Sequence, residues 1–236
     1  MSDNMPRRCL AEFIGTFGIV FFGCGSIASM QGQEALAKHI GVNAVFGGIV
    51  AAMIYALGGI SAAHFNPAVT VGFAIAKRFP ARYAPHYLAA QFGGAIFASL
   101  LHYLLFPALA APVKYGATLP SLTPFGAAMV EVVLTYFLML VIISVATDRR
   151  VNGAIPALAI GITVFLCGVF GGSLTGCSMN PARSLAPALF AGSPALSVIG
   201  IYLLAPIIGA MGGAMTFEWL RTGAEFAQNA PADLIA

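Results

Sequence analysis

The stretch that decides the fold is SAAHFNPAVTVG, from Ser61 to Gly72, and a related stretch, TGCSMNPARSLA, runs from Thr175 to Ala186. Both contain Asn-Pro-Ala, and the two asparagines, Asn66 and Asn180, are 114 residues apart. Asparagine is a preferred N-cap residue and proline is favoured at the first helical position, so each copy predicts the start of a helix. Long apolar segments flank both copies.

The composition of the chain indicates that lipid surrounds most of it. Of its 236 residues, 59% are hydrophobic and only 8% are charged, whereas a soluble domain carries about 25% charged residues. A bilayer core about 30 Å thick is crossed by a helical run of about 20 apolar residues. Uncharged runs of this kind occur at residues 9–30, 40–60, 84–106, 124–146, 154–173 and 196–217. We therefore predict an all-α membrane protein with six transmembrane helices.

The charged residues and the cysteines exclude several other classes of protein. The formal net charge of +3 is small and dispersed, which argues against a nucleic-acid partner. The four cysteines, at positions 9, 24, 167 and 177, lack the spacing of a metal site or of a disulfide framework. The sequence has no His-Glu-x-x-His motif, no Gly-x-Ser-x-Gly motif and no paired acid and base. We therefore predict no catalytic residue, no metal site and no cofactor.

The basic residues of the connections predict the orientation in the membrane. If the six spans alternate in direction, only Lys38 and Lys114 fall on one side. Eight basic residues fall on the other side: Arg7, Arg8, Lys77, Arg78, Arg82, Arg149, Arg150 and Arg221. Because basic residues accumulate in cytoplasmic loops, both termini are predicted to be cytoplasmic, in a multi-pass protein of the inner or plasma membrane.

The two halves of the chain resemble each other in sequence. The first span opens with AEFIGTF from Ala11 and the fourth with VEVVLTY from Val130, and each has Glu, then Thr four residues later, then an aromatic residue. The third and sixth spans also share a pattern of small residues at every fourth position, which permits close helix packing. These residues are Ala90, Gly94 and Ala98 in the first half and Ala205, Gly209 and Gly213 in the second. We predict one domain, 1–236, composed of repeats 1–115 and 120–236.

Each repeat holds three spans, an odd number, so the second repeat is predicted to enter the membrane from the opposite side. Inverted repeats of this kind place the functional site near the midplane, where the two halves meet. The run from Asn66 to Ala76 predicts a helix of about ten residues, and the run from Asn180 is similar. Such a helix is about 15 Å long, half the hydrocarbon thickness. We therefore predict two re-entrant half-helices, one from each face.

The two half-helices are expected to meet by their N-termini beside a pore, because non-helical backbone at membrane depth is tolerated only beside protein or a wet cavity. Each N-terminus carries about half a positive charge, so the pair repels cations. The N–H groups of Asn66 and Asn180 can donate to the oxygen of a passing water. A water oxygen that accepts from both cannot accept from its neighbour, which interrupts proton transfer along a file of waters.

The motifs EFIGTF, HFNPAVT and GCSMNPARS, together with the layout of six spans and two half-helices, resemble the aquaporins of the major intrinsic protein family over nearly the whole chain. The resemblance implies a passive channel for water and small neutral solutes, with one pore in each subunit of a homotetramer. Aquaporins are known to select solutes by half-helix dipoles and an arginine, so this resemblance and the electrostatic interpretation are not independent. The pore motifs that it implies are Asn66, Pro67 and Ala68, and Asn180, Pro181 and Ala182.

The resemblance also implies which residues form the narrowest part of the pore. Matching the family's filter positions gives Phe46, Gly168, Cys177 and Arg183. Strict water channels of the family usually have His at the position of Gly168, so a wider pore that also admits glycerol or an undissociated metalloid hydroxide is expected. Other positions disagree: family glycerol channels usually have Asp after the filter Arg, where this chain has Ser184. Ala188 and the pair Tyr202–Leu203 also leave the signature mixed.

Glu12 and Glu131 lie within predicted spans, where a charge needs a partner. They either carry ions or protons, as in a secondary transporter with inverted repeats, or accept hydrogen bonds from the re-entrant loops, as the resemblance implies. His64 either anchors its loop or lines the pore, and Gln91 is expected to be a helix-packing contact. The main functional alternative to a channel is therefore a secondary transporter.

Overall fold

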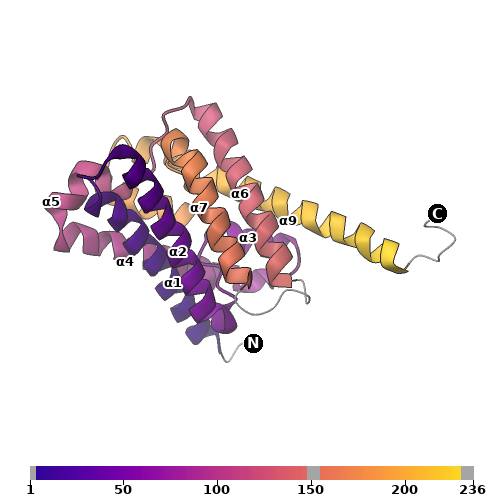
Figure 1. Ribbon diagram of the computed structural model, residues 1–236. Coiled ribbons are helices and arrows are strands. Elements are labelled where there is room, and N and C mark those ends of the chain that lie inside the picture. Colours follow the sequence, from indigo (N-terminus) through magenta and orange to yellow (C-terminus); the bar gives the residue numbers. More distant parts are fainter. Residues whose placement is uncertain (1–3, 148–154, 230–236) are drawn as a thin grey trace.

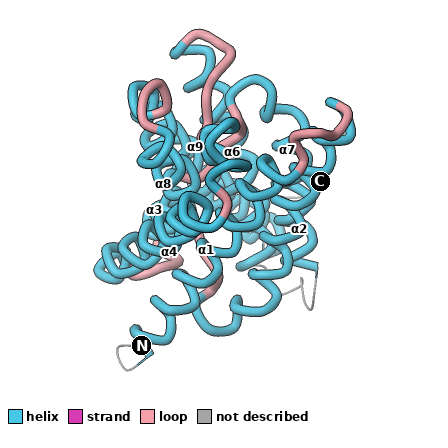
Figure 2. Tube along the Cα trace, turned by 90° about the vertical axis from the view of Figure 1, so that its left-hand side faces the viewer, coloured by secondary structure: helices cyan, strands magenta, loops and turns pink. Residues whose placement is uncertain are grey.

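The computed structural model describes residues 4–147 and 155–229, and within these ranges the chain is helical and has no strand (Figures 1 and 2). Six helices are long and apolar enough to cross a membrane, which confirms the number of predicted spans. They are α1 (Met5–Ser29), α2 (Ala35–Ser61), α4 (Ala84–Leu105), α6 (Pro124–Thr147), α7 (Ile155–Thr175) and α9 (Ile199–Asn229). The repeat boundaries and the orientation argument also used residues 1–3, 148–154 and 230–236, which lie outside the described ranges.

Two shorter helices begin at the Asn-Pro-Ala motifs. Helix α3 (Pro67–Ile75) has 9 residues and α8 (Pro181–Ala191) has 11. At 1.5 Å per residue they are about 14 and 17 Å long, about half the thickness of a bilayer core. The remaining short elements are η2 (Ala81–Tyr83), α5 (Pro107–Ala110), η3 (Ala111–Gly116) and η4 (Leu196–Val198). Helix α5 and η3 belong to the connection between the halves and were not predicted.

The packing of the helices has the symmetry of an inverted repeat. Helix α1 packs on α4 as α6 packs on α9, and α2 packs on α7. Each half-helix also reaches across to the other half, since α3 packs on α9 and α8 packs on α4. The two repeats are therefore interlocked.

Close contacts between backbones occur at repeat-related glycines. A Cβ atom on Gly47 would lie 2.5 Å from the carbonyl oxygen of Gly161, and a Cβ on Gly161 would lie 2.6 Å from that of Gly47. These two glycines, from α2 and α7, are 114 residues apart, so the pseudo-twofold axis passes between them. A Cβ on Gly94 of α4 would collide with a carbonyl of α1, and one on Gly209 of α9 with a carbonyl of α6.

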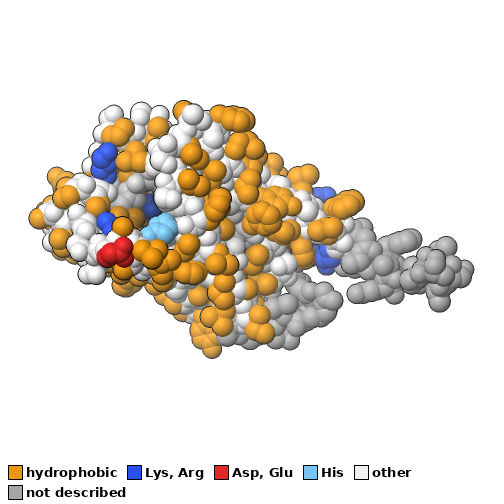
Figure 3. Space-filling model, turned by 45° about the horizontal axis from the view of Figure 1, so that its top comes forward, with side chains coloured by type: hydrophobic (Ala, Val, Ile, Leu, Met, Phe, Trp, Pro, Cys, Tyr) orange, Lys and Arg blue, Asp and Glu red, His pale blue; other side chains and the backbone are white. Residues whose placement is uncertain are grey.

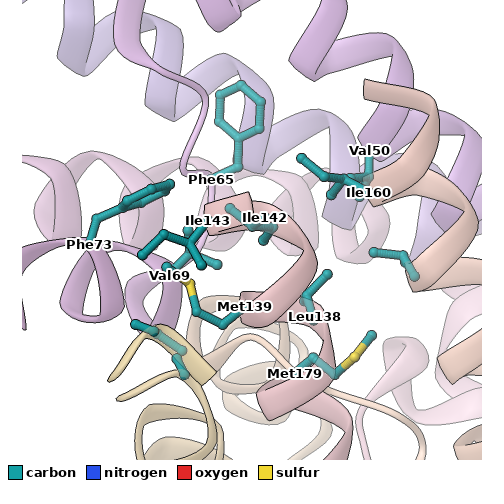
Figure 4. Packing of buried hydrophobic residues seen from close by; sticks show 14 of the residues in the cluster. Val50, Phe65, Val69, Phe73, Leu138, Met139, Ile142, Ile143, Ile160 and Met179 are labelled. Carbon is teal, nitrogen blue, oxygen red and sulfur yellow. The ribbon is translucent and has the colours of Figure 1, made fainter. Parts of the chain in front are cut away.

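The core lies around the half-helix α3 and the two loops that precede the half-helices. Figure 4 shows Phe65 and Met179 of the loops and Val69 of α3 among side chains of α2, α6 and α7. The outer faces of the long helices expose large apolar side chains, such as Phe125, Phe170 and Trp219, and Figure 3 shows hydrophobic side chains spread over the face that it presents. Such an exterior is suited to lipid rather than to water.

The two ends of the helix bundle differ in their elements. At one end, Arg78, which follows α3, forms an ion pair of 2.8 Å with Glu218 of α9, and Cys9 of α1 lies 3.8 Å from a carbonyl of α4. We call this end, where α1 begins, the near end. The opposite end carries α5, η3 and the start of α2, and we call it the far end (Figure 1).

Candidate functional site

The two half-helices begin with the same N-cap geometry. Asn66 and Asn180 have extended backbones, and a proline follows each at the first helical position, where a missing N–H costs nothing. Asn66 Oδ1 accepts from Ala68 N at 2.9 Å. Asn180 Oδ1 accepts from Ala182 N at 3.0 Å and from Arg183 N at 3.3 Å. Each asparagine side chain thus satisfies free N–H groups at the start of its own helix.

The same two asparagines join the half-helices to each other. Asn66 Nδ2 donates to Met179 O at 2.7 Å, and Asn180 Nδ2 donates to Phe65 O at 3.0 Å. Each carboxamide therefore bonds the residue that precedes the opposite asparagine. Because an amide NH₂ has two hydrogens, each Nδ2 retains a second donor beyond this bond. The reciprocal bonds hold the two positive helix ends together and fix the direction in which those donors point.

Two buried glutamates hold the loops in front of the half-helices. Glu12 accepts from Ser61 Oγ, His64 N, Phe65 N and Gln91 Nε2 at 2.6–2.9 Å. Glu131 accepts from Thr175 Oγ1, Ser178 N and Met179 N at 2.7–2.8 Å. In both cases, each carboxylate oxygen accepts from one of two consecutive backbone N–H groups. Both side chains are fully buried, and these donors supply the partners that a charge in lipid requires.

The backbone of these loops is strained in the same way in both repeats. In the first loop Ala62, Ala63 and Phe65 have positive φ, and so do the second loop's counterparts. The counterparts, each 114 residues further along, are Gly176, Cys177 and Met179. A non-glycine residue in this region costs about 1–3 kcal/mol, and such strain persists where the surroundings over-determine it. Here the hydrogen bonds to the glutamates and asparagines hold the loops in this strained conformation.

His64 contributes both to a hydrogen-bond network and to the wall of the cavity described below. Its Nδ1 lies 3.1 Å from Thr70 Oγ1, and its ring stacks on Phe73 with 4.8 Å between centroids. Thr70 Oγ1 also accepts from Gln91 Nε2 at 2.9 Å and donates to Asn66 O. His64 therefore both contacts its own half-helix and lines the cavity, the two positions that sequence analysis considered for it. Gln91 also belongs to this hydrogen-bond network, whereas the sequence predicted only a helix-packing contact for it.

A cavity of about 680 Å³ runs past both asparagines. On α2 it is lined from Ala35 at the far end to Gly58 at the near end, a distance of about 35 Å along a helix. This is comparable to the thickness of about 30 Å of a bilayer core, so the cavity is long enough to cross one. On α7 the lining residues recur at every fourth position, Pro156, Ile160, Val164, Gly168 and Gly172, as one helix face requires. Figure 3 shows His, Lys or Arg, and Asp or Glu side chains around a hollow in one face.

The four predicted filter residues all line this cavity, between the asparagines and the far end. Arg183 Nη1 donates to Gly116 O at 2.7 Å, and its guanidinium lies over the ring of Phe46, 5.0 Å from the centroid. Arg183 is 3% exposed, and its Nε is buried without a hydrogen-bond partner among the described residues. Gly168 and Cys177 complete the set. An aromatic surface and a group rich in donors thus lie side by side in the lining.

The repeat-related positions at the near end also line the cavity but are apolar. The counterparts of Phe46, Gly168, Cys177 and Arg183, each 114 residues away, are Ile160, Ile54, Ala63 and Val69. The cavity is therefore symmetric in its backbone and asymmetric in its chemistry.

Sequence analysis missed Gly116 at the far end, and it did not predict the hydrogen-bond partners of Ser184 and Tyr202. Gly116, the partner of Arg183, follows Lys114 and Tyr115, and all three have positive φ. Ser184, which departs from the family's glycerol type, bonds Thr118 Oγ1 at 2.8 Å and also Ser178. Tyr202 OH donates to Thr175 O at 2.6 Å. Neither Ser184 nor Tyr202 is among the described residues that line the cavity. At these two positions the mixed signature therefore concerns hydrogen bonds that support the loop before α8.

Among residues 4–147 and 155–229, no three His, Cys, Asp or Glu side chains lie close enough to hold a metal ion. The free thiol of Cys177 is half-buried and faces the cavity. The described lining thus combines side chains that can donate hydrogen bonds, such as Asn66, Asn180 and Arg183, with apolar side chains.

Comparisons with known proteins agree with this description. The family model for the major intrinsic protein matches residues 1–217. Aquaporin NIP1-4 of Oryza sativa subsp. japonica is 41% identical over 94% of this chain and 79% of its own length. Nodulin-26 of Glycine max is 40% identical over 91% of this chain and 78% of its own. The aquaglyceroporin of Plasmodium falciparum has the same fold, with a TM-score of 0.78 over 98% of both chains at 24% identity.

Proposed function

The chain belongs to the major intrinsic protein family, and on this premise we propose that its cavity conducts water and small uncharged solutes such as glycerol while excluding protons and ions. It is a multi-pass membrane channel for neutral solutes and not an enzyme. The single observation that carries the proposal is the pairing of Asn66 and Asn180 beside a cavity as long as the membrane is thick.

Proton exclusion follows from the proposed role of this pair. Two helix N-termini, each with about half a positive charge, raise the energy of a cation between them. The free hydrogens of the two Nδ2 groups then donate to the oxygen of a water, whose own hydrogens point outward in both directions. A proton cannot be relayed through a water that accepts no hydrogen bond from its neighbours. Arg183 adds a second positive charge on the far side.

The size and polarity of the proposed filter favour small neutral polyols as well as water. Gly168 contributes no side chain, and the Phe46 ring and the Arg183 guanidinium, in contact with each other, place an apolar surface beside a group rich in donors in the cavity lining. Glycerol has the same two-sided character, with carbon on one side and hydroxyl groups on the other. An undissociated metalloid hydroxide is also small, uncharged and rich in hydroxyl groups, and it is the second solute class that the filter suits.

A coupled transporter is disfavoured by the engagement of the two glutamates. Glu12 and Glu131 accept four and three hydrogen bonds from their loops and neighbours. A coupling ion or proton would have to displace these donors. Flux that is linear in the osmotic gradient fits a channel, whereas flux that saturates and follows a proton or sodium gradient fits a transporter.

We also propose the orientation and assembly of the channel. The described basic residues Arg7, Arg8, Lys77, Arg78, Arg82 and Arg221 belong to the near end, which supports a cytoplasmic position for it and for both termini. The membrane is then the inner or plasma membrane. The family implies a homotetramer with one pore in each subunit, which the mass of the detergent-solubilised protein would test.

The experiment that tests the proposal compares water, glycerol and metalloid permeability in one proteoliposome preparation by stopped-flow light scattering. We expect water and glycerol fluxes above those of empty liposomes and a stable imposed pH difference. High water flux with glycerol flux equal to that of empty liposomes would contradict the wide filter. Rapid loss of the pH difference would contradict the role of the asparagine pair.

A further inference from the structure

The space left by Gly168 is already occupied by another side chain. A Cβ atom on Gly168 would collide with Asn43 Oδ1 and would lie 2.8 Å from Asn43 Cγ and 3.2 Å from Asn43 Cβ. Asn43 is on α2, one helical turn before Phe46, and it lines the cavity. The carboxamide of Asn43 therefore stands where a side chain at position 168 would begin.

The orientation of this carboxamide is fixed from its own helix. Asn43 Nδ2 donates to His39 O, one turn earlier on α2, at 2.8 Å. The His39 ring is held in turn, because its Nε2 lies 2.8 Å from Val169 O and a Cβ on Gly172 would lie 3.1 Å from its Cε1. Two polar residues of α2 thus pack over two glycines of α7. Asn43 is only 7% exposed, so this arrangement is a packed one.

The repeat offers a comparison within the same chain. The position 114 residues after Asn43 is Ala157, a buried residue of α7 that is not among the described residues lining the cavity. Of these two repeat-related positions, only the one at the far end is polar, and it lies on the same level as Gly168. This asymmetry matches that of the filter, whereas the backbone scaffold is symmetric.

We propose that Asn43 is a fifth residue of the constriction and determines its specificity: its carboxamide takes the place of a side chain at position 168. The proposal rests on the proposed function, because it assumes that solute passes through this cavity. It implies a narrower passage than the four filter positions alone predict. A carboxamide also has both donors and an acceptor, so it can replace the hydrogen bonds that a polar side chain at 168 would give.

Two effects on permeation follow. Truncation of Asn43 should widen the passage, so glycerol and the bulkier erythritol gain more than water does. Replacement by an apolar residue of similar width should keep bulky solutes out but remove a hydrogen-bonding partner of water. Water that loses such a partner in a narrow passage crosses a higher barrier, because unpaired polar groups are costly there.

The test measures glycerol, erythritol and water permeability of Asn43→Ala, Asn43→Val and the wild-type protein in proteoliposomes. Val45→Ala is the matched control, because Val45 lies on the same turn of α2 and is not among the described residues lining the cavity. We expect Asn43→Ala to raise the glycerol-to-water ratio by about tenfold, which corresponds to a barrier lower by ~1.4 kcal/mol. We expect Val45→Ala to leave the ratio unchanged and Asn43→Val to lower water permeability several-fold.

A double-mutant cycle tests the spatial claim independently of flux. Gly168→Ala alone should lower thermal stability, because its methyl group collides with the carboxamide, whereas in the Asn43→Ala background only the 3.2 Å approach to the Cβ of residue 43 remains. We therefore expect Gly168→Ala to lower the thermal stability less in the Asn43→Ala background than in the wild-type protein. Additive stability effects would contradict the packing claim even if a single variant folds poorly.

The outcomes separate this inference from the proposed function. If the wild-type protein conducts neither water nor glycerol, the proposed function fails. If it conducts but Asn43→Ala has the wild-type ratio of glycerol to water, the inference fails and the function stands. Unchanged water permeability in Asn43→Val would overturn the hydrogen-bonding part of the inference.

Discussion

The substitution Glu131→Gln tests whether an ionised carboxylate holds the second re-entrant loop. Glu131 Oε1 accepts from Ser178 N and Oε2 from Met179 N, both at 2.8 Å. Backbone N–H groups can only donate, so both carboxylate oxygens must accept. A glutamine has one oxygen and one NH₂, and in either orientation its NH₂ faces a backbone N–H. The variant therefore loses at least one buried hydrogen bond and leaves a donor unpaired.

The magnitude follows from that loss. A hydrogen bond to a charged group contributes about 1.5–3 kcal/mol, and an unpaired buried donor adds its desolvation cost. We expect Glu131→Gln to lower the free energy of unfolding by about 2–4 kcal/mol, which shifts the midpoint of thermal unfolding by on the order of 5–10 °C. Water permeability per protein should fall as well, because the loop carries Met179, the acceptor of the Asn66 side chain.

The assay is thermal unfolding of the detergent-solubilised protein together with stopped-flow water flux. Glu34→Gln is the matched control. Glu34 also accepts one backbone N–H on each carboxylate oxygen, at 3.1 Å, but it is exposed, so water can replace a lost partner. A Glu131→Gln protein with the wild type's stability and water permeability would refute the requirement for two acceptor oxygens.

Three further predictions follow from the same structure. Arg183→Leu removes the bond to Gly116 O and the positive charge of the filter, so we expect a faster collapse of an imposed pH or cation gradient, measured with a dye inside proteoliposomes. Mercurial reagents should block water flux through wild-type protein by reacting with Cys177, and Cys177→Ser should abolish the block; persistent block would show that the thiol is not in the passage. Two backbone hydrogen bonds lower the pKa of Glu34, so its contribution to stability is present above the unfolded-state pKa of about 4.3 and is lost as the pH falls through the folded-state value. The stability difference between wild type and Glu34→Ala should therefore be present at neutral pH and vanish in acid.

The parts of the fold that sequence analysis predicted depend on local signals. The six spans follow from hydropathy, and the half-helices follow from Asn66 and Asn180, whose capping role needs only the next few residues. The inverted arrangement follows from counting three spans in each repeat. None of these inferences requires knowledge of which residues meet across the protein.

The parts that sequence analysis missed depend on contacts between distant residues. The partner of Arg183 is the backbone carbonyl of Gly116. Because every residue has a backbone carbonyl, the residue type at position 116 does not indicate this hydrogen bond. That carbonyl is set by left-handed turns at Lys114 and Tyr115, residue types that rarely adopt positive φ. Asn43 was missed for a related reason: its importance comes from the absence of a side chain at Gly168, on another helix.

Only the far end of the cavity carries the polar filter residues, although the backbone is symmetric, and this difference has a physical reason. A solute passes the near end, the asparagine pair and the far end in series, so one selective constriction decides which solutes cross in either direction. A second constriction at Ile160, Ile54, Ala63 and Val69 would add resistance without adding selectivity. The paired half-helix dipoles, in contrast, require both repeats, because each contributes one of the two positive ends. Duplication therefore explains the barrier at the midplane, and divergence between the two repeats, at Asn43 in the first and at Gly168 and Arg183 in the second, explains the filter.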